Sequence, residues 1–241
     1  MFFNRPDCTE LVPGIYVFKK YVPLEMCKRY TDILNTFDPA DFNEEGNAID
    51  WYDDKMSPPV PGIIDLWEHI SELLYPDYVI NPQAQVITSR VGHEGMFVHC
   101  DSPGKENADM LTQNDTYGTC SLIDYGVVAY LSEFEGGDVI YPAFLPDGTL
   151  KETEEIESIP EHLSYKPEPG DVVIHRSEAP YYHGTLPVTK GIRYAFSCFA
   201  TQYDMAPGTF YNYKSDKYLH YVKDRSEESI GRWLQGDDYQ P

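Results

Sequence analysis

The segment GMFVHCDSPG contains a histidine and an aspartate two positions apart, His99 and Asp101. Alternate residues of a β-strand point to the same face, so in an extended segment both side chains could reach one metal ion while Cys100 points away. A second imidazole would complete the facial triad that holds non-haem iron(II) and leaves coordination positions open. Because a chain with 7 histidines and many aspartates produces such a pair by chance, the pair needs support from elsewhere in the sequence.

The segment YYHGTLPVTKGIRYAFSCFA supplies that support through His183 and Arg193. If His183 begins one strand and Arg193 lies on the next, a tight turn at Val188–Gly191 would fold the two side chains toward one cavity. An inward guanidinium would offer a carboxylate two parallel hydrogen bonds, as a dicarboxylate co-substrate requires. Arg193 lies among apolar residues, so an inward orientation needs an anionic partner, and the alternative is a surface ion pair.

His175 is the rival to His183 as the second imidazole. It ends the segment PEPGDVVIH, and its distance along the chain from Arg193 is too long for the expected turn. The spacing therefore favours His183. The remaining histidines show no comparable spacing: His69, His93, His162 and His220.

Two helices are expected before the β-rich part of the chain. Pro23–Phe37 begins with a proline suited to a first helical turn, and its apolar residues recur at helical spacing. Gly62–Tyr75 shows the same spacing and is ended by Pro76. Between them Asp38–Pro61 is polar and rich in Pro and Asp, which is typical of a long loop that closes over a site.

From Tyr78 onward the sequence consists of short runs rich in β-branched and aromatic residues, separated by Gly, Pro and Asp. The expected strands are Val79–Val91, Met96–Cys100, Tyr125–Ser132, Asp138–Tyr141, Asp171–His175 and Arg193–Thr201. Many short strands with turn signals favour a sandwich, barrel or jelly roll. We further expect a second closing loop at Ser102–Cys120, a surface insertion at Leu145–Gly170 and a packed helix at Ser215–Gly236.

The composition bounds the class of protein. A chain of 241 residues with 41% hydrophobic and 14% aromatic residues can bury a large core, and without a recognisable linker one domain is expected. A net charge of −22 disfavours binding to nucleic acid or to an anionic membrane surface. Its 5 cysteines form no C-x-x-C pair, which favours a reducing compartment. Neither a signal peptide nor a membrane-spanning run is recognisable, so the expected location is the cytoplasm.

The order of these segments resembles the iron(II)/2-oxoglutarate-dependent oxygenase superfamily, and in particular its prolyl 4-hydroxylase-like branch. FEGGDVIYP is similar to that branch's strand–turn–strand with a double glycine, and PEPGDVVIH to its Pro-x-x-Gly-Asp strand. The spacing from His183 through Pro187 and Gly191 to Arg193 matches its distal histidine and 2-oxoglutarate anchor. The matching region covers roughly Gln85–Ala200, about half of the chain.

The resemblance implies a mainly β fold with flanking helices and a double-stranded β-helix (jelly-roll) core. Residues 1–241 would form one domain. Helical support would occupy 1–77, the jelly-roll core 78–203, and a tail with a helix 204–241.

The resemblance also implies a set of bound groups. His99, Asp101 and His183 would hold Fe(II). Arg193 would bind the C5 carboxylate of 2-oxoglutarate, with Tyr130 as a second contact. O2 would be the other co-substrate, and ascorbate would bind as a reductant. Arg193 stands where collagen-type prolyl hydroxylases usually carry lysine, which is a departure from that subfamily.

The implied reaction couples decarboxylation of 2-oxoglutarate to succinate with hydroxylation of an unactivated C–H bond. Its substrate would be a prolyl or other amino-acid residue in a protein or peptide, or a free amino acid. Two alternatives stay open: a nucleobase or nucleic-acid demethylase of the same superfamily, and a jelly-roll binding module without catalysis. The charge of −22 and the missing basic stripe disfavour the first, and the complete ligand set disfavours the second.

Overall fold

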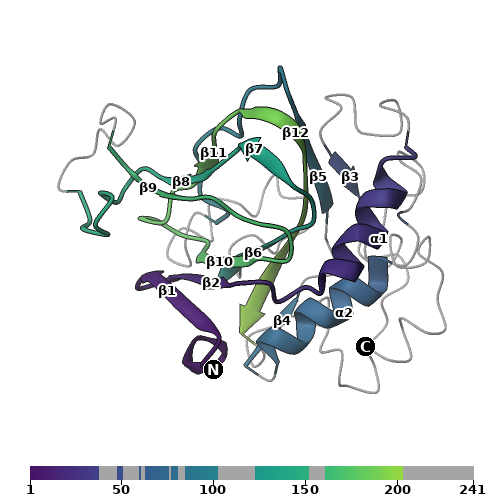
Figure 1. Ribbon diagram of the computed structural model, residues 1–241. Helices are drawn as coiled ribbons and strands as arrows, with labels where there is room; N and C mark the ends of the chain where they lie inside the picture. The colour runs from purple at the N-terminus through teal and green to yellow at the C-terminus, as the bar shows by residue number, and fades with distance from the viewer. Residues whose placement is uncertain are drawn as a thin grey trace, which may run out of the picture.

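The computed structural model describes residues 1–37, 48–50, 60, 63–75, 77–80, 85–102, 123–151 and 161–202. Within them the helices are η1 (Phe2–Asn4, a 3-10 helix), α1 (Leu24–Leu34) and α2 (Ile63–Leu74). The strands are β1 (Cys8–Val12), β2 (Ile15–Phe18), β3 (Ala48–Asp50), β4 (Tyr78–Ile80), β5 (Gln85–Arg90), β6 (Tyr125–Tyr130), β7 (Phe134–Gly136), β8 (Val139–Tyr141), β9 (Leu163–Tyr165), β10 (Val172–Arg176), β11 (Gly184–Thr185) and β12 (Val188–Gln202). Both α-helices lie on one side of the strands (Figure 1).

The described strands form two antiparallel sheets. The larger sheet runs in the order β1-β2-β10-β6-β12-β5-β3, and both β4 and β7 also pair with β12. The smaller sheet runs in the order β11-β8-β9. β6 lies between β10 and β12 although it ends at Tyr130 and β10 begins only at Val172, so three segments contribute to one surface. The expectation of a mainly β fold with flanking helices is confirmed.

Side-chain alternation gives the large sheet two different faces. On β12 the side chains of one parity pack into the core beneath the helices: Tyr194, Phe196, Cys198 and Ala200. Those of the other parity line a cavity on the opposite face: Arg193, Ala195, Ser197 and Phe199. β6 and β10 follow the same rule, so one face of the sheet forms the packed core and the other carries the candidate site.

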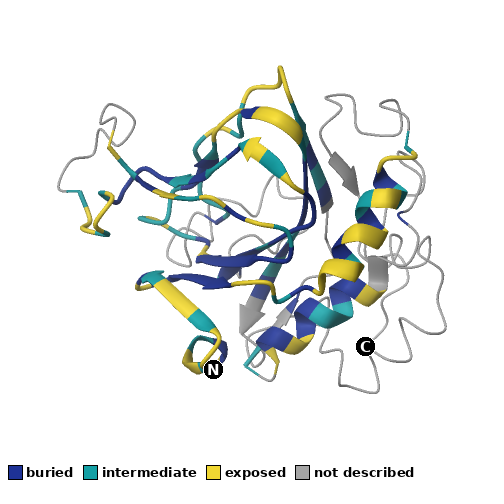
Figure 2. Ribbon diagram, in the orientation of Figure 1, coloured by how far each residue is buried: buried dark blue, intermediate teal, exposed yellow. Residues whose placement is uncertain are grey.

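Both α-helices bury one apolar stripe against the large sheet (Figure 2). α1 begins after Pro23 and buries Cys27, Tyr30 and Leu34, which recur at helical spacing. α2 buries Trp67 and four aliphatic residues in the same core. The helices predicted at Pro23–Phe37 and Gly62–Tyr75 are confirmed, with ends that differ by less than one turn. Neither described α-helix has the length and apolar character that crossing a membrane requires.

Several local expectations are wrong. Met96–Cys100 is not a strand, because only His99 within it forms a β-bridge. No turn lies at Val188–Gly191, because β12 begins at Val188 and is bent by a bulge and by the positive φ of Gly191 (78°). Leu145–Gly170 is more than a surface insertion, because it contains β9, which pairs with β8.

The N-terminal third is not purely helical. β1 and β2 form a hairpin, and β2 pairs with β10 inside the large sheet. The run predicted as one strand at Val79–Val91 contains β4 and β5 as separate strands. Most of the predicted loops Asp38–Pro61 and Ser102–Cys120 lies outside the described residues, as does the helix predicted at Ser215–Gly236.

Asp171 connects the loop before β10 to the segment that follows β2, and it is only 1% exposed. Its carboxylate accepts hydrogen bonds from the backbone N–H groups of Lys20 (2.9 Å) and Glu168 (3.0 Å) and from the Tyr165 hydroxyl. The aspartate of the PEPGD segment therefore fixes the start of a strand that carries part of the candidate site.

We expect Asp171→Ala to lower the free energy of unfolding by about 3 kcal/mol, because it removes the buried acceptor of three part-buried hydrogen bonds. Urea denaturation measures the loss. Asp147→Ala, which removes an exposed carboxylate bonded to the backbone N–H of Thr149, is the control and should cost less than about 1 kcal/mol. Equal losses in the two variants would contradict the role given to Asp171.

Candidate metal centre

His99 and His183 are partners in an isolated antiparallel β-bridge. The N–H of each residue donates to the carbonyl oxygen of the other, with both N···O distances 2.9 Å. Directly opposed residues project their side chains to the same face, and here the two ring centroids lie 4.5 Å apart. The approach needs glycine at position 184, because a Cβ on Gly184 would lie 2.8 Å from the carbonyl oxygen of Met96. A short contact between distant segments thus brings two imidazoles together.

Asp101 places a carboxylate oxygen beside both imidazoles. Its Oδ1 lies 3.5 Å from His99 Nε2 and 3.6 Å from His183 Nε2. These separations are too long for good hydrogen bonds. The three donor atoms nevertheless lie within 4.8 Å of one another, so they could bind a single cation. The structure brings the three sequence-predicted residues together, although a bridge rather than a regular strand positions them.

The second nitrogen of each imidazole is held by the backbone. His99 Nδ1 lies 2.9 Å from the carbonyl oxygen of Phe97, and His183 Nδ1 lies 3.1 Å from that of Tyr181. A carbonyl oxygen can only accept, so each Nδ1 carries a proton, and Nε2 is the ring nitrogen that remains to bind a metal once the ring is neutral. Metal-ligating histidines are commonly oriented by such a carbonyl partner. The donor set therefore fits a bound transition metal.

The electrostatics keep Asp101 in its charged form. Burial alone would raise the pKa of Asp101, but the imidazoles of His175, His183 and His99 hold it well below its usual value. The same contact with Asp101 raises the pKa of His99, against the effect of burial. A carboxylate that stays ionised at neutral pH attracts a cation to this point.

His175 lies on β10 next to this group, and it is 2% exposed. Its Nε2 lies 3.2 Å from Asp101 Oδ2, and its Nδ1 lies 3.4 Å from the Tyr141 hydroxyl. Burial and the nearby His183 lower the pKa of His175 to about 4, so its ring is neutral at neutral pH. The group of mutually close donor atoms contains His183 and not His175, in keeping with the spacing in the sequence.

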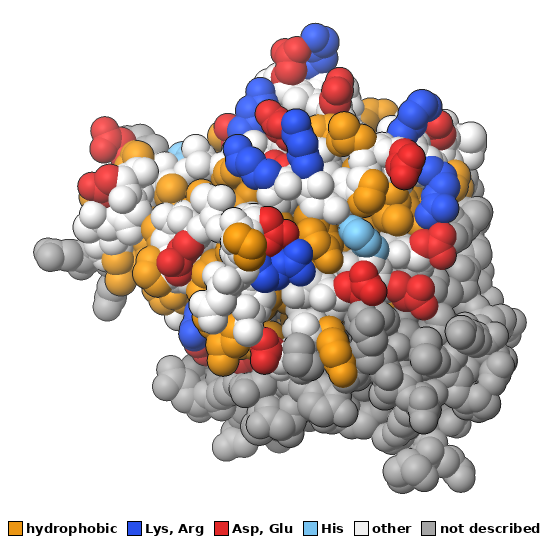
Figure 3. All heavy atoms as spheres, turned by 60° about the horizontal axis from the view of Figure 1, so that its bottom comes forward, with side chains coloured by type: hydrophobic (Ala, Val, Ile, Leu, Met, Phe, Trp, Pro, Cys, Tyr) orange, Lys and Arg blue, Asp and Glu red, His pale blue; other side chains and the backbone are white. Residues whose placement is uncertain are grey.

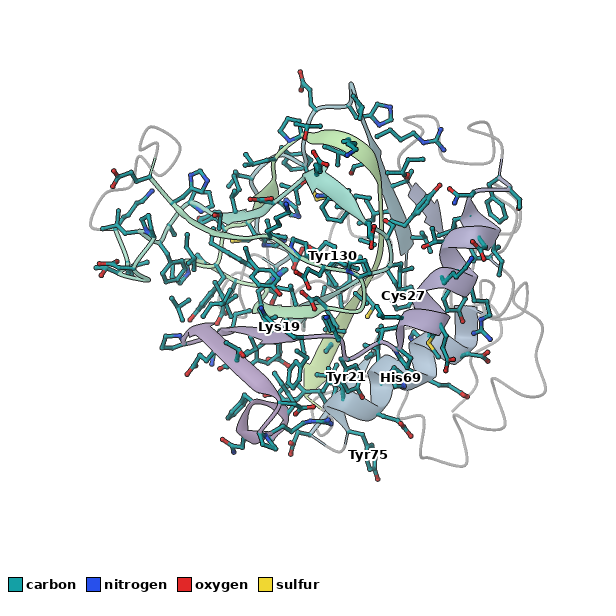
Figure 4. All side chains as sticks on the ribbon, viewed as in Figure 1. Lys19, Tyr21, Cys27, His69, Tyr75 and Tyr130 are labelled. Carbon is teal, nitrogen blue, oxygen red and sulfur yellow. The ribbon has the colours of Figure 1, made fainter. Side chains whose placement is uncertain are left out.

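A cavity of about 160 Å³ lies beside these residues on the inner face of the large sheet. Its walls are mostly apolar: Ile87, Met96, Val128, Val139, Val173, Ala195 and Phe199. The strand register sets the order of the residues along the cavity: Gly126 is opposite His175 and Phe199, whereas Tyr130 is opposite Ala195. About 13 Å of strand separate Gly126 from Tyr130. Figure 4 shows Tyr130 between the two sheets, whereas Cys27 lies on the helical side of the large sheet.

Arg193 lines the same cavity and is only 2% exposed. It donates from Nη1 to the carbonyl oxygen of Gly137 (3.2 Å) and from Nη2 to the Ser89 hydroxyl (2.7 Å), while its Nε has no hydrogen-bond partner in the described part of the chain. Among the described residues no carboxylate forms an ion pair with Arg193. Burial lowers the pKa of Arg193, an effect that Tyr130 partly offsets. A buried cation with an unused donor fits a site for an anion.

The sequence matches no family model and no curated protein. Solved structures match it in fold. A prolyl hydroxylase from Trichoplax adhaerens, in complex with a peptide fragment of the hypoxia inducible factor oxygen degradation domain, is 14% identical, with a TM-score of 0.53 over 80% of this chain and 85% of that one. This chain has the prolyl hydroxylase fold.

Two further structures with the prolyl hydroxylase fold agree. The viral collagen prolyl hydroxylase of Paramecium Bursaria Chlorella virus-1, in its 2OG complex, is 14% identical, with a TM-score of 0.50 over 78% of this chain and 96% of that one. A Pseudomonas putida prolyl-4-hydroxylase is 16% identical, with a TM-score of 0.50 over 78% and 92%. The predicted jelly-roll core is thereby confirmed, whereas identities this low transfer neither reaction nor substrate.

Sequence reasoning missed Ser89, Gly126 and Tyr141, each of which contacts or adjoins a predicted site residue. A glycine inside a strand is a signal that another group approaches closely, and Gly126 could have been found in this way. Ser89 and Tyr141 gave no signal, because their partners lie far away in the sequence and are reached only through strand pairing. Tyr130 lines the cavity with Arg193.

Proposed function

We propose that this protein is an Fe(II)- and 2-oxoglutarate-dependent dioxygenase that hydroxylates an unactivated C–H bond. The observation that carries the proposal is the convergence of two Nε2 atoms and one carboxylate oxygen beside a small cavity that also contains a buried guanidinium. A metal triad alone would suit many enzymes, and a buried arginine alone would suit many anions. Their combination on the prolyl hydroxylase fold supports this one reaction class.

His99, Asp101 and His183 would hold the iron from one face. Together with 2-oxoglutarate, the bound iron supplies the activation of O2 that side chains cannot supply. The chain contributes orientation, because the backbone hydrogen bonds of the two Nδ1 atoms hold both Nε2 atoms toward the Asp101 carboxylate. It also contributes charge, because Asp101 is held ionised.

Arg193 would bind the C5 carboxylate of 2-oxoglutarate, with Tyr130 as a second contact. Both side chains line the cavity, and Tyr130 acts against the lowering of the Arg193 pKa by burial. The apolar walls formed by Val128 and Val173 suit the methylene groups of the co-substrate and exclude water.

The substrate that we propose is a prolyl or other amino-acid residue in a peptide, with a free amino acid as the smaller alternative. The Trichoplax protein of the same fold was solved with a peptide fragment, which supports a peptide. His99 is the most exposed of the three proposed ligands, with 25% of its side chain accessible, so the site opens on its side. Phe97 stands 77% exposed there with its ring centroid 5.1 Å from that of His99, and it offers an apolar surface to a substrate.

Two further parts of the proposal concern the surroundings of the enzyme. We place it in the cytoplasm, where its cysteines would stay reduced: the four that lie in the described residues, Cys8, Cys27, Cys100 and Cys198, are free thiols. Ascorbate would serve as the reductant that keeps the iron in its divalent state.

The test is succinate formation from 2-oxoglutarate by purified protein, with Fe(II) supplied and then omitted. We expect wild-type protein to form succinate only when both Fe(II) and 2-oxoglutarate are present. His99→Ala, which removes a proposed ligand, should form none above background. Lys28→Ala, far from the site on α1, is the control and should retain full turnover. Succinate formation that persists in His99→Ala would show that the metal is held elsewhere.

The two alternatives are less well supported. On the face drawn in Figure 3, basic side chains of the described residues are interleaved with acidic ones, which gives no continuous stripe for a nucleic-acid backbone. A gel shift with single-stranded and duplex nucleic acid tests the demethylase. A binding module without catalysis does not require three metal-binding atoms beside a buried guanidinium. Calorimetry that detects no 2-oxoglutarate binding in the presence of Mn(II) would support the module.

A further inference from the structure

The Asp101 carboxylate has two oxygens in different surroundings. Oδ1 faces the Nε2 atoms of His99 and His183 at 3.5 and 3.6 Å. Oδ2 instead lies 3.2 Å from Nε2 of His175, a buried residue outside the group of mutually close donor atoms. The two oxygens of this side chain are therefore already assigned to different partners.

The His175 ring is itself fixed from its other side. Its Nδ1 lies 3.4 Å from the hydroxyl of Tyr141, which is fully buried on β8. The carboxylate can only accept, so His175 Nε2 carries the proton and donates it, while Nδ1 accepts from the Tyr141 hydroxyl. The resulting series of hydrogen bonds leads from Tyr141 in the small sheet, through His175 on β10, to Asp101.

The large sheet makes room for this contact. His175 is paired directly with Gly126 on β6, and a Cβ on Gly126 would lie 2.6 Å from His175 Nε2 and closer still to Asp101 Oδ2. A strand interior normally disfavours glycine. Here its missing side chain leaves the space that the carboxylate and the imidazole share.

We propose that His175 is a positioning residue that donates a hydrogen bond to Asp101 Oδ2 and so leaves Oδ1 alone to bind the metal. The inference rests on the proposed function, because it assigns a role toward the iron that His99, Asp101 and His183 would hold. With Oδ2 engaged, Asp101 binds through one oxygen and stays rotated toward the two imidazoles. Three coordination positions then remain for 2-oxoglutarate and O2.

The experiment compares His175→Phe with His175→Gln. Phenylalanine fills the buried volume without a donor, whereas glutamine can place an amide N–H near the position of Nε2–H. Mn(II) affinity is measured by competition with a chromophoric chelator, and thermal unfolding of the metal-free proteins reports folding. We expect His175→Phe to bind Mn(II) about 10- to 100-fold more weakly than wild type and His175→Gln to recover part of that loss.

The Co(II)-loaded proteins give a second readout that packing alone would not move. We expect the absorption spectrum of His175→Phe to differ from that of wild type, because Asp101 is free to bind through both oxygens, and that of His175→Gln to resemble wild type. A folded His175→Phe with wild-type Mn(II) affinity and an unchanged Co(II) spectrum would overturn the inference. So would equal affinities in His175→Phe and His175→Gln.

Tyr141→Phe keeps the test decisive if His175→Phe does not fold. It leaves the His175 ring in place and removes only the hydroxyl at Nδ1, so we expect a weaker Mn(II) affinity by up to about 10-fold. An affinity equal to wild type in this variant would overturn the inference in that case. Wild-type protein that binds no metal at all would instead overturn the proposed function, and the positioning role with it.

Discussion

Asp101→Ala should abolish metal binding and leave succinate formation at background level. Asp101 provides the only negative charge among the three proposed ligands, and its Oδ1 is the atom that both Nε2 atoms face. Two neutral imidazoles without this carboxylate hold a divalent cation weakly, so we expect Mn(II) affinity to fall by at least about 100-fold. This loss should exceed that caused by removing a residue that only orients a ligand. Calorimetric titration of the metal-free protein with Mn(II) measures this effect.

A graded series makes this result specific. His183→Ala should resemble Asp101→Ala, whereas Glu135→Ala, which removes a surface carboxylate bonded to Lys190, should leave metal binding unchanged. The His175 variants should fall between these limits. If His175→Ala abolished binding while His183→Ala kept it, the assignment of the second imidazole would have to be reversed.

Arg193→Met should weaken 2-oxoglutarate binding by about 30-fold or more while metal binding persists. The guanidinium is buried, and its Nε lacks a partner among the described residues, so the anion that we propose would find in it both charge and free donors. Loss of one partner of a buried, hydrogen-bonded charge pair costs about 2–5 kcal/mol, which corresponds to a dissociation constant raised by about 30-fold or more.

Stability gives a second measure of the same variant. In wild type, 2-oxoglutarate at about 100 times its dissociation constant should stabilise the Mn(II)-loaded protein by about 2.7 kcal/mol. With its dissociation constant raised about 30-fold or more, Arg193→Met should keep no more than about 0.9 kcal/mol of this stabilisation at the same concentration. Arg193→Lys is the matched control: it keeps the charge but loses the planar fork, so an intermediate affinity is expected. Full 2-oxoglutarate binding by Arg193→Met would place the anion site elsewhere.

The sequence predicts those parts of the fold that depend on local periodicity. The apolar spacing of Cys27, Tyr30 and Leu34 describes the buried face of α1 before any tertiary contact is known. The β-branched and aromatic residues of YGVVAY likewise indicate β6. β1 and β2 escape such reasoning because short strands carry few alternations, and only the pairing of β2 with β10 makes them part of the sheet.

The candidate site also has parts that the sequence predicts and parts that it does not. Residue types and spacing single out His99, Asp101, His183 and Arg193, because metal and carboxylate recognition require those chemical groups. What spacing cannot show is the bridge between two irregular segments that joins His99 to His183. Spacing also cannot show the role of His175. Its chemical type made it a rival ligand, and its contact with Asp101 Oδ2 is seen only in the folded structure.

The most direct test of the account is the anomalous difference density of a crystal grown with Mn(II) and 2-oxoglutarate. We expect one strong peak within bonding distance of His99 Nε2, His183 Nε2 and Asp101 Oδ1, with His175 outside the coordination sphere and a co-substrate carboxylate against Arg193. A peak held by other side chains, or a carboxylate bound away from Arg193, would contradict the account.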